Sequence, residues 1–319
     1  MTVADADAPR LSFLAGVWRR AAGGHDGTPW GVIMTFMAPA LLMYAVFTAY
    51  PVIRTFYNSV LRIQPLVGDQ YIGLQNFTEL LSADAIFRKA VVNTLIWGTA
   101  APVIDVALGL LLALCLYAKV PFSRVFRVAW FSPVLISYVV VGIVWMWIYN
   151  YEWGVANALL RAIGLGGWAE DWLGKPATAL WALLLVDAWK WTGFNMVVCL
   201  AALHSLPSEV LEAAELDNCG WLVKLTLVMM PMMRATLINL LILAFIGKMK
   251  VFDLVWITTK GGPLWSTETV STYVYKRAFA WSTFDLGYPS AVAVVWFVVI
   301  MVFVLLLTWW SRQRGRLEY

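Results

Sequence analysis

Residues 286–311, LGYPSAVAVVWFVVIMVFVLLLTWWS, contain no charged side chain. This stretch lies between Asp285 and Arg312, and a helix of about 20 apolar residues is enough to cross the hydrocarbon core of a bilayer. Two further stretches, 27–53 and 128–151, are also free of charge. Because backbone in contact with lipid must satisfy its own hydrogen bonds, each of the three stretches predicts a membrane-spanning helix.

The composition of the whole chain also indicates a membrane protein. Of 319 residues, 61% are hydrophobic and 13% are charged, whereas a soluble domain carries about 25% charged residues. The net charge of +4 is spread along the chain without a basic block, which argues against nucleic-acid binding. The cysteines form no C-x-x-C pair, so they predict neither a disulfide framework nor a metal site. They are Cys115, Cys199 and Cys219.

Three other stretches are long enough to span a membrane only if ionisable side chains lie inside them. These stretches are 90–118, 176–208 and about 225–257. The ionisable residues inside them include Asp105, Asp187, Lys190, Arg234, Lys248 and Lys250. The sequence therefore predicts an all-α, polytopic membrane helix bundle of about six transmembrane helices. The expected spans are about 31–53, 91–117, 128–150, 179–203, 232–257 and 287–311.

An even number of spans places both termini on the same side of the membrane. Residues 1–29 begin acidic, contain one short apolar run and lack a cleavage site, so they predict a tail and not a signal peptide. Basic residues are equally numerous on the two sides, but the shortest loop, 119–127, carries three of them and no acid. This favours cytoplasmic tails at 1–29 and 312–319.

Residues 204–231, HSLPSEVLEAAELDNCGWLVKLTLVMMP, have a different pattern from the spans. Pro207 suits the first position of a helix, and Asn218 suits its end because Asn tolerates the left-handed conformation. The stretch predicts a short surface helix that presents Glu212. Its expected inward-facing residues are Val210, Leu211 and Ala214. On physical grounds alone, an ordinary solvated connector explains the stretch equally well.

The same stretch resembles the EAA motif of ATP-binding-cassette (ABC) importer permeases, E-A-A-x3-G-x9-I-x-L-P, from Glu212 to Pro231. Residues 252–263 resemble the F-D-x5-T-x-G-G-P motif of the sugar-importer branch, and 73–77 resemble a motif upstream of it. The likeness runs from about residue 35 to the carboxyl end. It departs from the family pattern where the motif glycine is Asn218.

This resemblance implies a type I ABC importer permease fold, with a permease domain at 30–311 and a cytoplasmic coupling loop at 204–231. It implies location in the bacterial cytoplasmic (inner) membrane and import of a sugar, polyol, glycerol phosphate or other acidic sugar derivative. The implied partners are a second permease subunit in a heterodimer, two ATPase subunits and an extracytoplasmic solute-binding protein. The chain contains no G-x-x-x-x-G-K-[ST] loop. ATP and Mg are therefore expected on the ATPase subunits, with no catalytic residue, cofactor or metal site here.

The resemblance also implies roles for particular residues. Those expected to couple to the ATPase are Glu212, Ala213, Ala214, Asp217 and Asn218. Ionisable groups inside a membrane usually face the bundle interior or a water-filled cavity. The three predicted spans that contain ionisable residues are therefore expected to form the solute pathway. The implied pathway residues are Asp187, Trp191, Phe194, Ala244, Gly247, Lys248 and Val251. A lysine at position 248 suggests either an acidic solute or a buried carboxylate partner.

Purely structural roles and two other functions compete with these assignments. Asp187 and Lys190 are three residues apart on a helix and could satisfy each other, and Lys250 could extend toward the membrane surface. A secondary transporter driven by an ion gradient is an alternative function, but it would need an inverted repeat, and no symmetric halves are visible. An intramembrane enzyme would need a motif such as H-E-x-x-H or G-x-S-x-G, and neither occurs.

Overall fold

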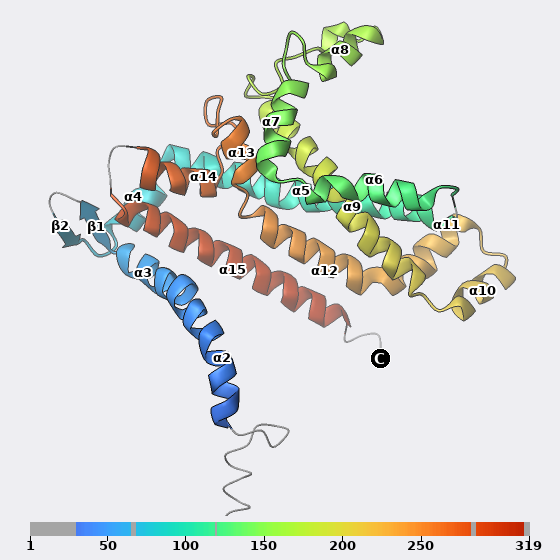
Figure 1. Cartoon of the computed structure of the whole chain (residues 1–319), viewed down its shortest axis with the longest axis horizontal. Helices are drawn as coiled ribbons and strands as arrows, with labels where there is room; N and C mark the ends of the chain where they lie inside the picture. The colour runs from blue at the N-terminus through green and yellow to red at the C-terminus, as the bar shows by residue number, and fades with distance from the viewer. Residues whose placement is uncertain (1–29, 65–67, 119, 282–284, 316–319) are drawn as a thin grey trace, which may run out of the picture. The chain divides into compact units, whose positions relative to one another are not determined.

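The computed structural model describes residues 30–64, 68–118, 120–281 and 285–315 (Figure 1). The predicted tail at 1–29 and residues 316–319 of the carboxyl-terminal tail lie outside the described residues. The chain is mainly helical and divides into two units, 1–57 and 58–319, which we describe separately.

The described part of the first unit is helical. Helix α2 (Trp30–Tyr44), the π-helical turn η1 (Ala45–Ala49) and α3 (Tyr50–Asn58) form one continuous stretch of 29 residues. The predicted span at 31–53 falls within it. None of the residues in α2, η1 or α3 is buried. A helix as apolar as α2 with no buried residue is typical of one that contacts lipid or another protein.

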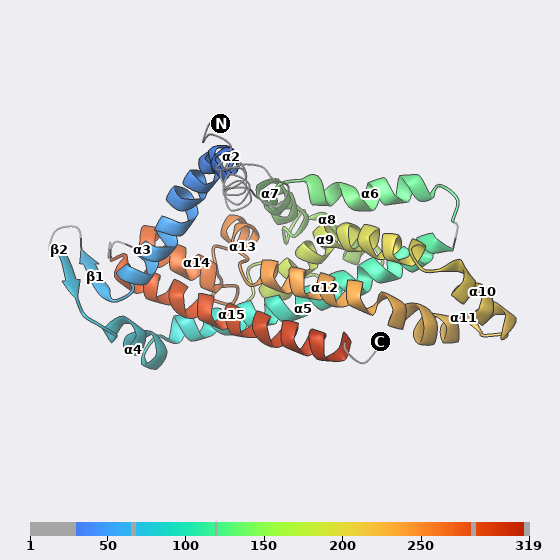
Figure 2. The same cartoon turned by 90° about the horizontal axis from the view of Figure 1, so that it is seen from below.

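Three long helices form the core of the second unit. Helices α5 (Ala85–Tyr117), α9 (Ala179–His204) and α12 (Met230–Lys248) pack against one another (Figure 2). Helices α5 and α9 approach closely at Gly109, where an added Cβ would lie 2.5 Å from the Cβ of Asn195. Small residues allow this kind of close packing between helices in membranes. Helix α15 (Gly287–Gly315) packs against α12 and covers the predicted span at 287–311.

The predicted span at 128–150 is not a single helix. Helices α6 (Ser123–Leu135) and α7 (Tyr138–Ile148) meet at an angle of 103°. Lys190 of α9 supports this break, because its Nζ donates to the carbonyl oxygens of Pro133 (3.0 Å) and Val134 (3.1 Å) and also to that of Ile136. The last carbonyls of a helix have no partner within the helix, and a cation near them is favourable. Lys190 therefore caps α6 and does not pair with Asp187.

The predicted span at 232–257 is also divided. Helix α11 (Trp221–Val223), the π-helical turn η3 (Lys224–Met229) and α12 follow one another and end at Lys248, and α13 (Asp253–Thr258) begins after a short break. Among the described residues, four helices are long and apolar enough to cross a membrane, or five if the bent α6–α7 pair counts as one span. Helix α12 is not one of them.

Shorter elements connect the spans. They are β1 (Leu61–Gln64), β2 (Gly68–Tyr71), α4 (Gln75–Ser82), α8 (Val155–Ala162), η2 (Gly166–Trp168), α10 (Ser208–Leu216), α14 (Val270–Tyr275) and η4 (Lys276–Ala280). The two strands pair antiparallel, with Leu61 opposite Tyr71. The sequence did not predict this hairpin.

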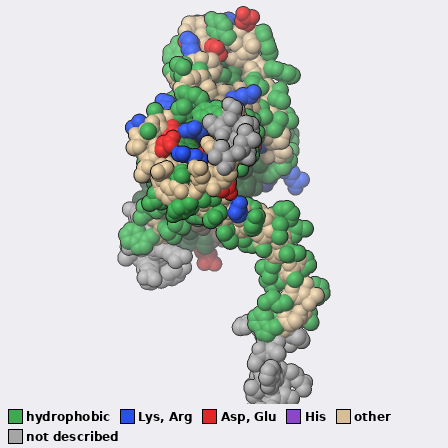
Figure 3. Space-filling view, turned by 90° about the vertical axis from the view of Figure 1, so that its left-hand side faces the viewer, with side chains coloured by type: hydrophobic (Ala, Val, Ile, Leu, Met, Phe, Trp, Pro, Cys, Tyr) green, Lys and Arg blue, Asp and Glu red, His purple; other side chains and the backbone are tan. Residues whose placement is uncertain are grey.

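Large apolar side chains lie on the outside of the second unit. Leu111 of α5 and Leu305 of α15 are each 58% exposed, and Phe297 is 50% exposed. The end of the molecule that carries β1, β2 and α4 shows hydrophobic side chains interspersed with other side chains and backbone, and its charged side chains form small groups (Figure 3). Exposed apolar surface of this extent indicates contact with lipid or a partner protein.

Candidate functional site

A cavity of about 290 Å³ lies among α5, α7, α9, α12 and the start of α13. Six of the seven residues that the sequence assigned to a solute pathway line this cavity. They are Trp191, Phe194, Ala244, Gly247, Lys248 and Val251. The seventh, Asp187, is fully buried and does not line the cavity, but its carboxylate contacts Lys248. The structure therefore brings residues of two separate predicted spans to one place.

Lys248 has two carboxylate partners. Its Nζ lies 2.5 Å from Asp187 Oδ2 and 2.9 Å from Asp105 Oδ2. Lys248 is only 7% exposed, and a buried ammonium is costly unless it is paired. The sequence left open whether Lys248 meets an acidic solute or a buried carboxylate. Because the chain itself supplies two carboxylates, Lys248 is not evidence for an acidic solute.

Asp187 is fully engaged. Its Oδ1 accepts a hydrogen bond from the Tyr138 hydroxyl (2.8 Å), and its Oδ2 accepts one from Trp97 Nε1 (3.2 Å) as well as from Lys248. The indole of Trp191 donates in turn to the Tyr138 hydroxyl (2.6 Å). The Lys248 ammonium also lies 5.3 Å from the centroid of the Trp191 ring. Asp187 thus fixes two groups that line the cavity, Lys248 directly and Trp191 through Tyr138.

Asp105 of α5 differs from Asp187. It has no exposed surface and lines the cavity. Its Oδ2 faces Lys248 as an ion pair, but the contact lacks hydrogen-bond geometry, and neither carboxylate oxygen has a hydrogen-bond partner among the described residues. The sequence showed Asp105 as a charge inside a span and left open whether it lines the cavity or contacts a second subunit. Its position in a span was the one signal that could have found it.

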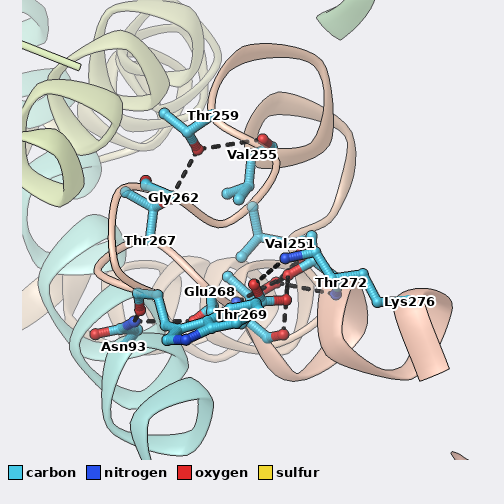
Figure 4. Close-up of polar contacts among 11 residues, drawn as sticks. Asn93, Val251, Val255, Thr259, Gly262, Thr267, Glu268, Thr269, Thr272 and Lys276 are labelled. Atoms are coloured by element: carbon cyan, nitrogen blue, oxygen red, sulfur yellow. Dashed lines mark hydrogen bonds and ion pairs between the residues drawn. The ribbon is translucent and has the colours of Figure 1, made fainter. Parts of the chain in front are cut away.

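The segment 251–255, which begins in the cavity wall, is held in place by polar contacts from the following loop (Figure 4). Thr269 Oγ1 donates to the carbonyl oxygen of Val251 at 3.0 Å. The Asn93 side chain of α5 donates to the carbonyl oxygens of Trp265 (3.0 Å) and Glu268 (2.9 Å). The loop is thereby attached both to the cavity wall and to α5.

A buried ion pair lies under this loop. Glu268, which has no exposed surface, pairs with Lys276 and accepts a hydrogen bond from the Thr272 hydroxyl at 2.8 Å. Burial raises the pKa of the Glu268 carboxyl, although the contacts with Lys276 and Thr272 oppose that rise. Gly261 has a φ of +83°, and an added Cβ there would lie 1.9 Å from a Glu268 oxygen. The T-x-G-G-P motif is therefore a turn that wraps closely around a buried ion pair.

The predicted turn at the end of helix α10 is present. Asn218 has a φ of +58°. Its N–H donates to the Glu215 carbonyl (3.0 Å), and that of Cys219 donates to the Ala214 carbonyl (3.1 Å). These bonds form the helix end that a glycine usually makes, so Asn218 supplies the same turn. Pro207 lies at the cap position before Ser208 and not at the first helical position.

Helix α10 exposes part of the predicted coupling set. Glu212, Ala213 and Asp217 are exposed, whereas Ala214 is buried against the chain's own helices together with Leu211. Ala214 therefore does not lie on the outer surface of α10. Val210 is 40% exposed, so its predicted inward position was wrong, since it lies one residue away from the buried pair.

Helix α10 is also linked to the membrane helices by charge. Lys224 Nζ, in η3, lies 2.5 Å from Glu215 Oε1. Lys224 is mostly buried, whereas the Glu215 side chain is largely exposed. Because η3 continues directly into α12, this pair connects the surface helix to the helix that carries Lys248.

Comparison with known proteins identifies relatives of this chain. Residues 105–315 match the family described as "Binding-protein-dependent transport system inner membrane component". The chain is 32% identical to the lactose transport system permease protein LacF of Rhizobium radiobacter, over 88% of this chain and 93% of LacF. It is 31% identical to the sulfoquinovosyl glycerol transport system permease protein SmoG of Agrobacterium fabrum, over 83% of this chain and 85% of SmoG.

A solved structure has the same fold. A chain of a bacterial alginate ABC transporter, in complex with its alginate pentasaccharide-bound periplasmic protein, superposes with a TM-score of 0.78. The match covers 88% of this chain and 94% of that chain at 23% sequence identity. The fold predicted from the sequence is therefore confirmed.

Proposed function

This chain belongs to the family of binding-protein-dependent transport system inner membrane components, and from that premise we propose that its solute is a carbohydrate or a carbohydrate derivative. The chain is a permease subunit of an ABC importer, and ATP hydrolysis lies on a separate subunit. The names of its relatives refer to lactose, arabinooligosaccharides and sulfoquinovosyl glycerol. A secondary transporter driven by an ion gradient is not supported, because the family and the relatives are ABC importers.

The cavity carries this proposal. Trp191 and Phe194 contribute aromatic rings to its lining, and their ring planes are nearly perpendicular, with centroids 5.9 Å apart. Aromatic faces pack well against the apolar faces of sugar rings, while polar groups at a few positions receive the hydroxyls. We place the solute against these two rings.

We further propose that the exposed side of α10 docks on an ATPase subunit. Glu212 is the charged anchor, and Ala213 allows close approach because its side chain is small. Leu216, which is 88% exposed, lies on the same side of the helix as Glu212 and Ala213. Movement of the ATPase would reach α12 through the Glu215–Lys224 pair and η3. Asp217 and Asn218 fix the end of α10, and Ala214 and Leu211 fix its inner side.

The complete importer then contains several chains. We propose a heterodimer of this permease with a second one, two ATPase subunits that bind ATP and Mg, and an extracytoplasmic binding protein. Both termini and α10 lie on the cytoplasmic side in this arrangement, as the basic loop at 119–127 favours. The family places the chain in the inner membrane.

The solute is tested first on the binding protein. Its thermal unfolding is measured with neutral sugars such as maltose and lactose, with polyols, and with glucuronate and glycerol 3-phosphate. A rise in melting temperature with any of these carbohydrates or derivatives is expected. A binding protein that responds to none of them, but to an amino acid or a peptide, would reject the proposal.

The coupling role is tested by Glu212→Ala in the assembled importer. Uptake is expected to fall at least about tenfold while the complex still assembles, since Glu212 is exposed and its removal leaves no buried group unpaired. Glu209→Ala is the matched comparison, because it removes an exposed acid one turn earlier on the same helix. An equal loss of uptake in both variants would mean that the ATPase recognises the general negative charge of α10 and not Glu212 in particular.

A further inference from the structure

Among the polar groups at the Asp105 end of the cavity, one hydrogen-bond acceptor has no donor. Tyr138 and Trp191 hydrogen-bond to each other, and Lys248 is held between two carboxylates. The Asn195 side chain donates to the Trp191 carbonyl at 3.0 Å. By contrast, Asp105 Oδ1 has no polar partner among the described residues, and Asp105 Oδ2 contacts the Lys248 ammonium at 2.9 Å, although Asp105 has no exposed surface.

The charges at this end do not balance either. Two carboxylates, Asp105 and Asp187, face the single ammonium of Lys248. The nearby Lys190 is already bound to the carbonyl oxygens at the end of α6. Lys250 and Asp253 also line the cavity, but both are exposed. The buried end is therefore rich in acceptors, with two carboxyl groups for one ammonium.

Chemistry decides which solute group fits such an end. A buried carboxylate that lines a cavity and has an unpartnered oxygen gains most from a hydroxyl donor, because hydrogen bonds to a charged acceptor are stronger than those between neutral groups. A carboxylate, phosphate or sulfonate on the solute would instead face Asp105 across a site of low dielectric constant, where like charges repel strongly. The uncompensated acceptor thus selects for hydroxyls and against anions.

We infer that Asp105 is a solute-binding residue that accepts hydrogen bonds from solute hydroxyls, and that the buried end of the cavity admits uncharged polyhydroxyl groups and disfavours anionic ones. This inference rests on the proposed carbohydrate function and makes it more specific. Lys248 and Asp187 are positioning residues, since Lys248 pairs with Asp105 and Asp187 holds Trp191 through Tyr138.

The test uses the complete importer in proteoliposomes, with its binding protein, second permease and ATPase subunits. The neutral probes are maltose, trehalose and lactose, and the anionic probes are glucuronate and glycerol 3-phosphate. Asp105→Asn keeps the size of the side chain and removes its charge. Lys248 then pairs with Asp187 alone, one cation with one carboxylate. The complex is therefore expected to assemble. Asp105→Ser is the second variant, because it removes the charge without adding an amide donor.

Both variants are expected to import the neutral sugar about tenfold more slowly or worse, as the loss of a hydrogen bond to a charged group implies. ATP hydrolysis stimulated by the binding protein is expected to stay within about twofold, so the amount of sugar carried per ATP falls. Glu79→Gln, an exposed acid on α4 far from the cavity lining, is the control and is expected to import as the wild type does.

The outcomes separate the two proposals. If the wild type imports glucuronate as well as it imports a neutral sugar, or if either variant carries as much sugar per ATP as the wild type, the role of Asp105 is wrong and the carbohydrate function stands. If none of the probes is bound by the binding protein or imported, the carbohydrate function itself fails, and the inference fails with it.

Discussion

Two lysines in this chain are buried to nearly the same extent but differ in the number of carboxylates that they contact. Lys276, 8% exposed, pairs with Glu268 in the loop that follows α13, and Lys248, 7% exposed, lies between Asp105 and Asp187. In the loop, one cation meets one carboxylate, and the Thr272 hydroxyl takes the other carboxylate oxygen. At the cavity, one cation meets two carboxylates, and one of these has no hydrogen-bond partner among the described residues.

The difference between the two clusters indicates their roles. A buried polar group whose hydrogen bonds are all made stabilises one conformation. A buried acceptor without a donor needs a hydrogen-bond partner that the chain does not supply. The Glu268–Lys276 pair is enclosed by backbone and holds the turn around Gly261. The Asp105–Lys248–Asp187 cluster borders a cavity. The first is structural, and the second is placed to bind solute.

The largest effect is expected for Lys248→Met. This change leaves two buried carboxylates next to each other without a cation, and breaking a buried ion pair in this way costs about 3–5 kcal/mol. We expect a large fall in the thermal unfolding midpoint of the purified permease complex. Asp105→Asn, which leaves Lys248 and Asp187 as a one-to-one pair, is the matched variant and is expected to change the midpoint little. Equal destabilisation by both variants would contradict the charge imbalance.

A smaller loss is expected for Lys276→Met. It also leaves a buried carboxylate without its cation, but only one carboxylate is involved, and Thr272 still donates to it. The cost is expected at about 3 kcal/mol, the lower end for a broken buried pair. The double variant Glu268→Gln with Lys276→Met should regain most of this stability, since both charges are then absent. A double variant that unfolds as easily as the single one would show that the pair has a role beyond charge compensation.

The sequence predicted those features that depend on local composition. Charge-free runs located the spans at 31–53 and 287–311. The family resemblance indicated Ala244, Gly247 and Lys248, which the structure places in one lining. Asn218 was identified as the end of the helix because asparagine tolerates the left-handed conformation whatever its neighbours are. The left-handed turn at Asn218 therefore follows from local sequence, and six residues of the cavity lining follow from motif spacing.

The features that were missed depend on distant contacts. Lys190 is three residues from Asp187, yet it binds the end of α6, because a break between Leu135 and Tyr138 leaves carbonyls there without partners. The sequence marks that break only through Pro133 near the end of α6 and Ser137 at the N-cap of α7. Asp105 and Lys248 meet only because α5 and α12 pack together. Burial of Ala214 and exposure of Val210 likewise depend on the angle at which α10 lies on the membrane helices.

The smallest effect on stability is expected from a change of pH. It distinguishes Glu268, in the loop after α13, from other carboxylates. Burial raises the pKa of Glu268 above its ordinary value of 4.5 in the folded protein, so the folded state binds a proton more tightly than the unfolded state does. Stability is therefore lost as the pH rises from about 4.5 through the raised pKa, and it is regained on acidification through the same range.

Asp84 provides the opposite sign for comparison. Burial alone would raise its pKa, but hydrogen bonds from Tyr273, Tyr288 and the Phe87 N–H, together with the charge of Arg277, lower it below 3.8. Its contribution to stability is thus present above pH 3.8 and is lost only in stronger acid. The measurement is the unfolding midpoint of the wild type and of Glu268→Gln between pH 7 and pH 4.5. The gain of the wild type on acidification should be absent from Glu268→Gln, and a gain of equal size in both would mean that another group is responsible.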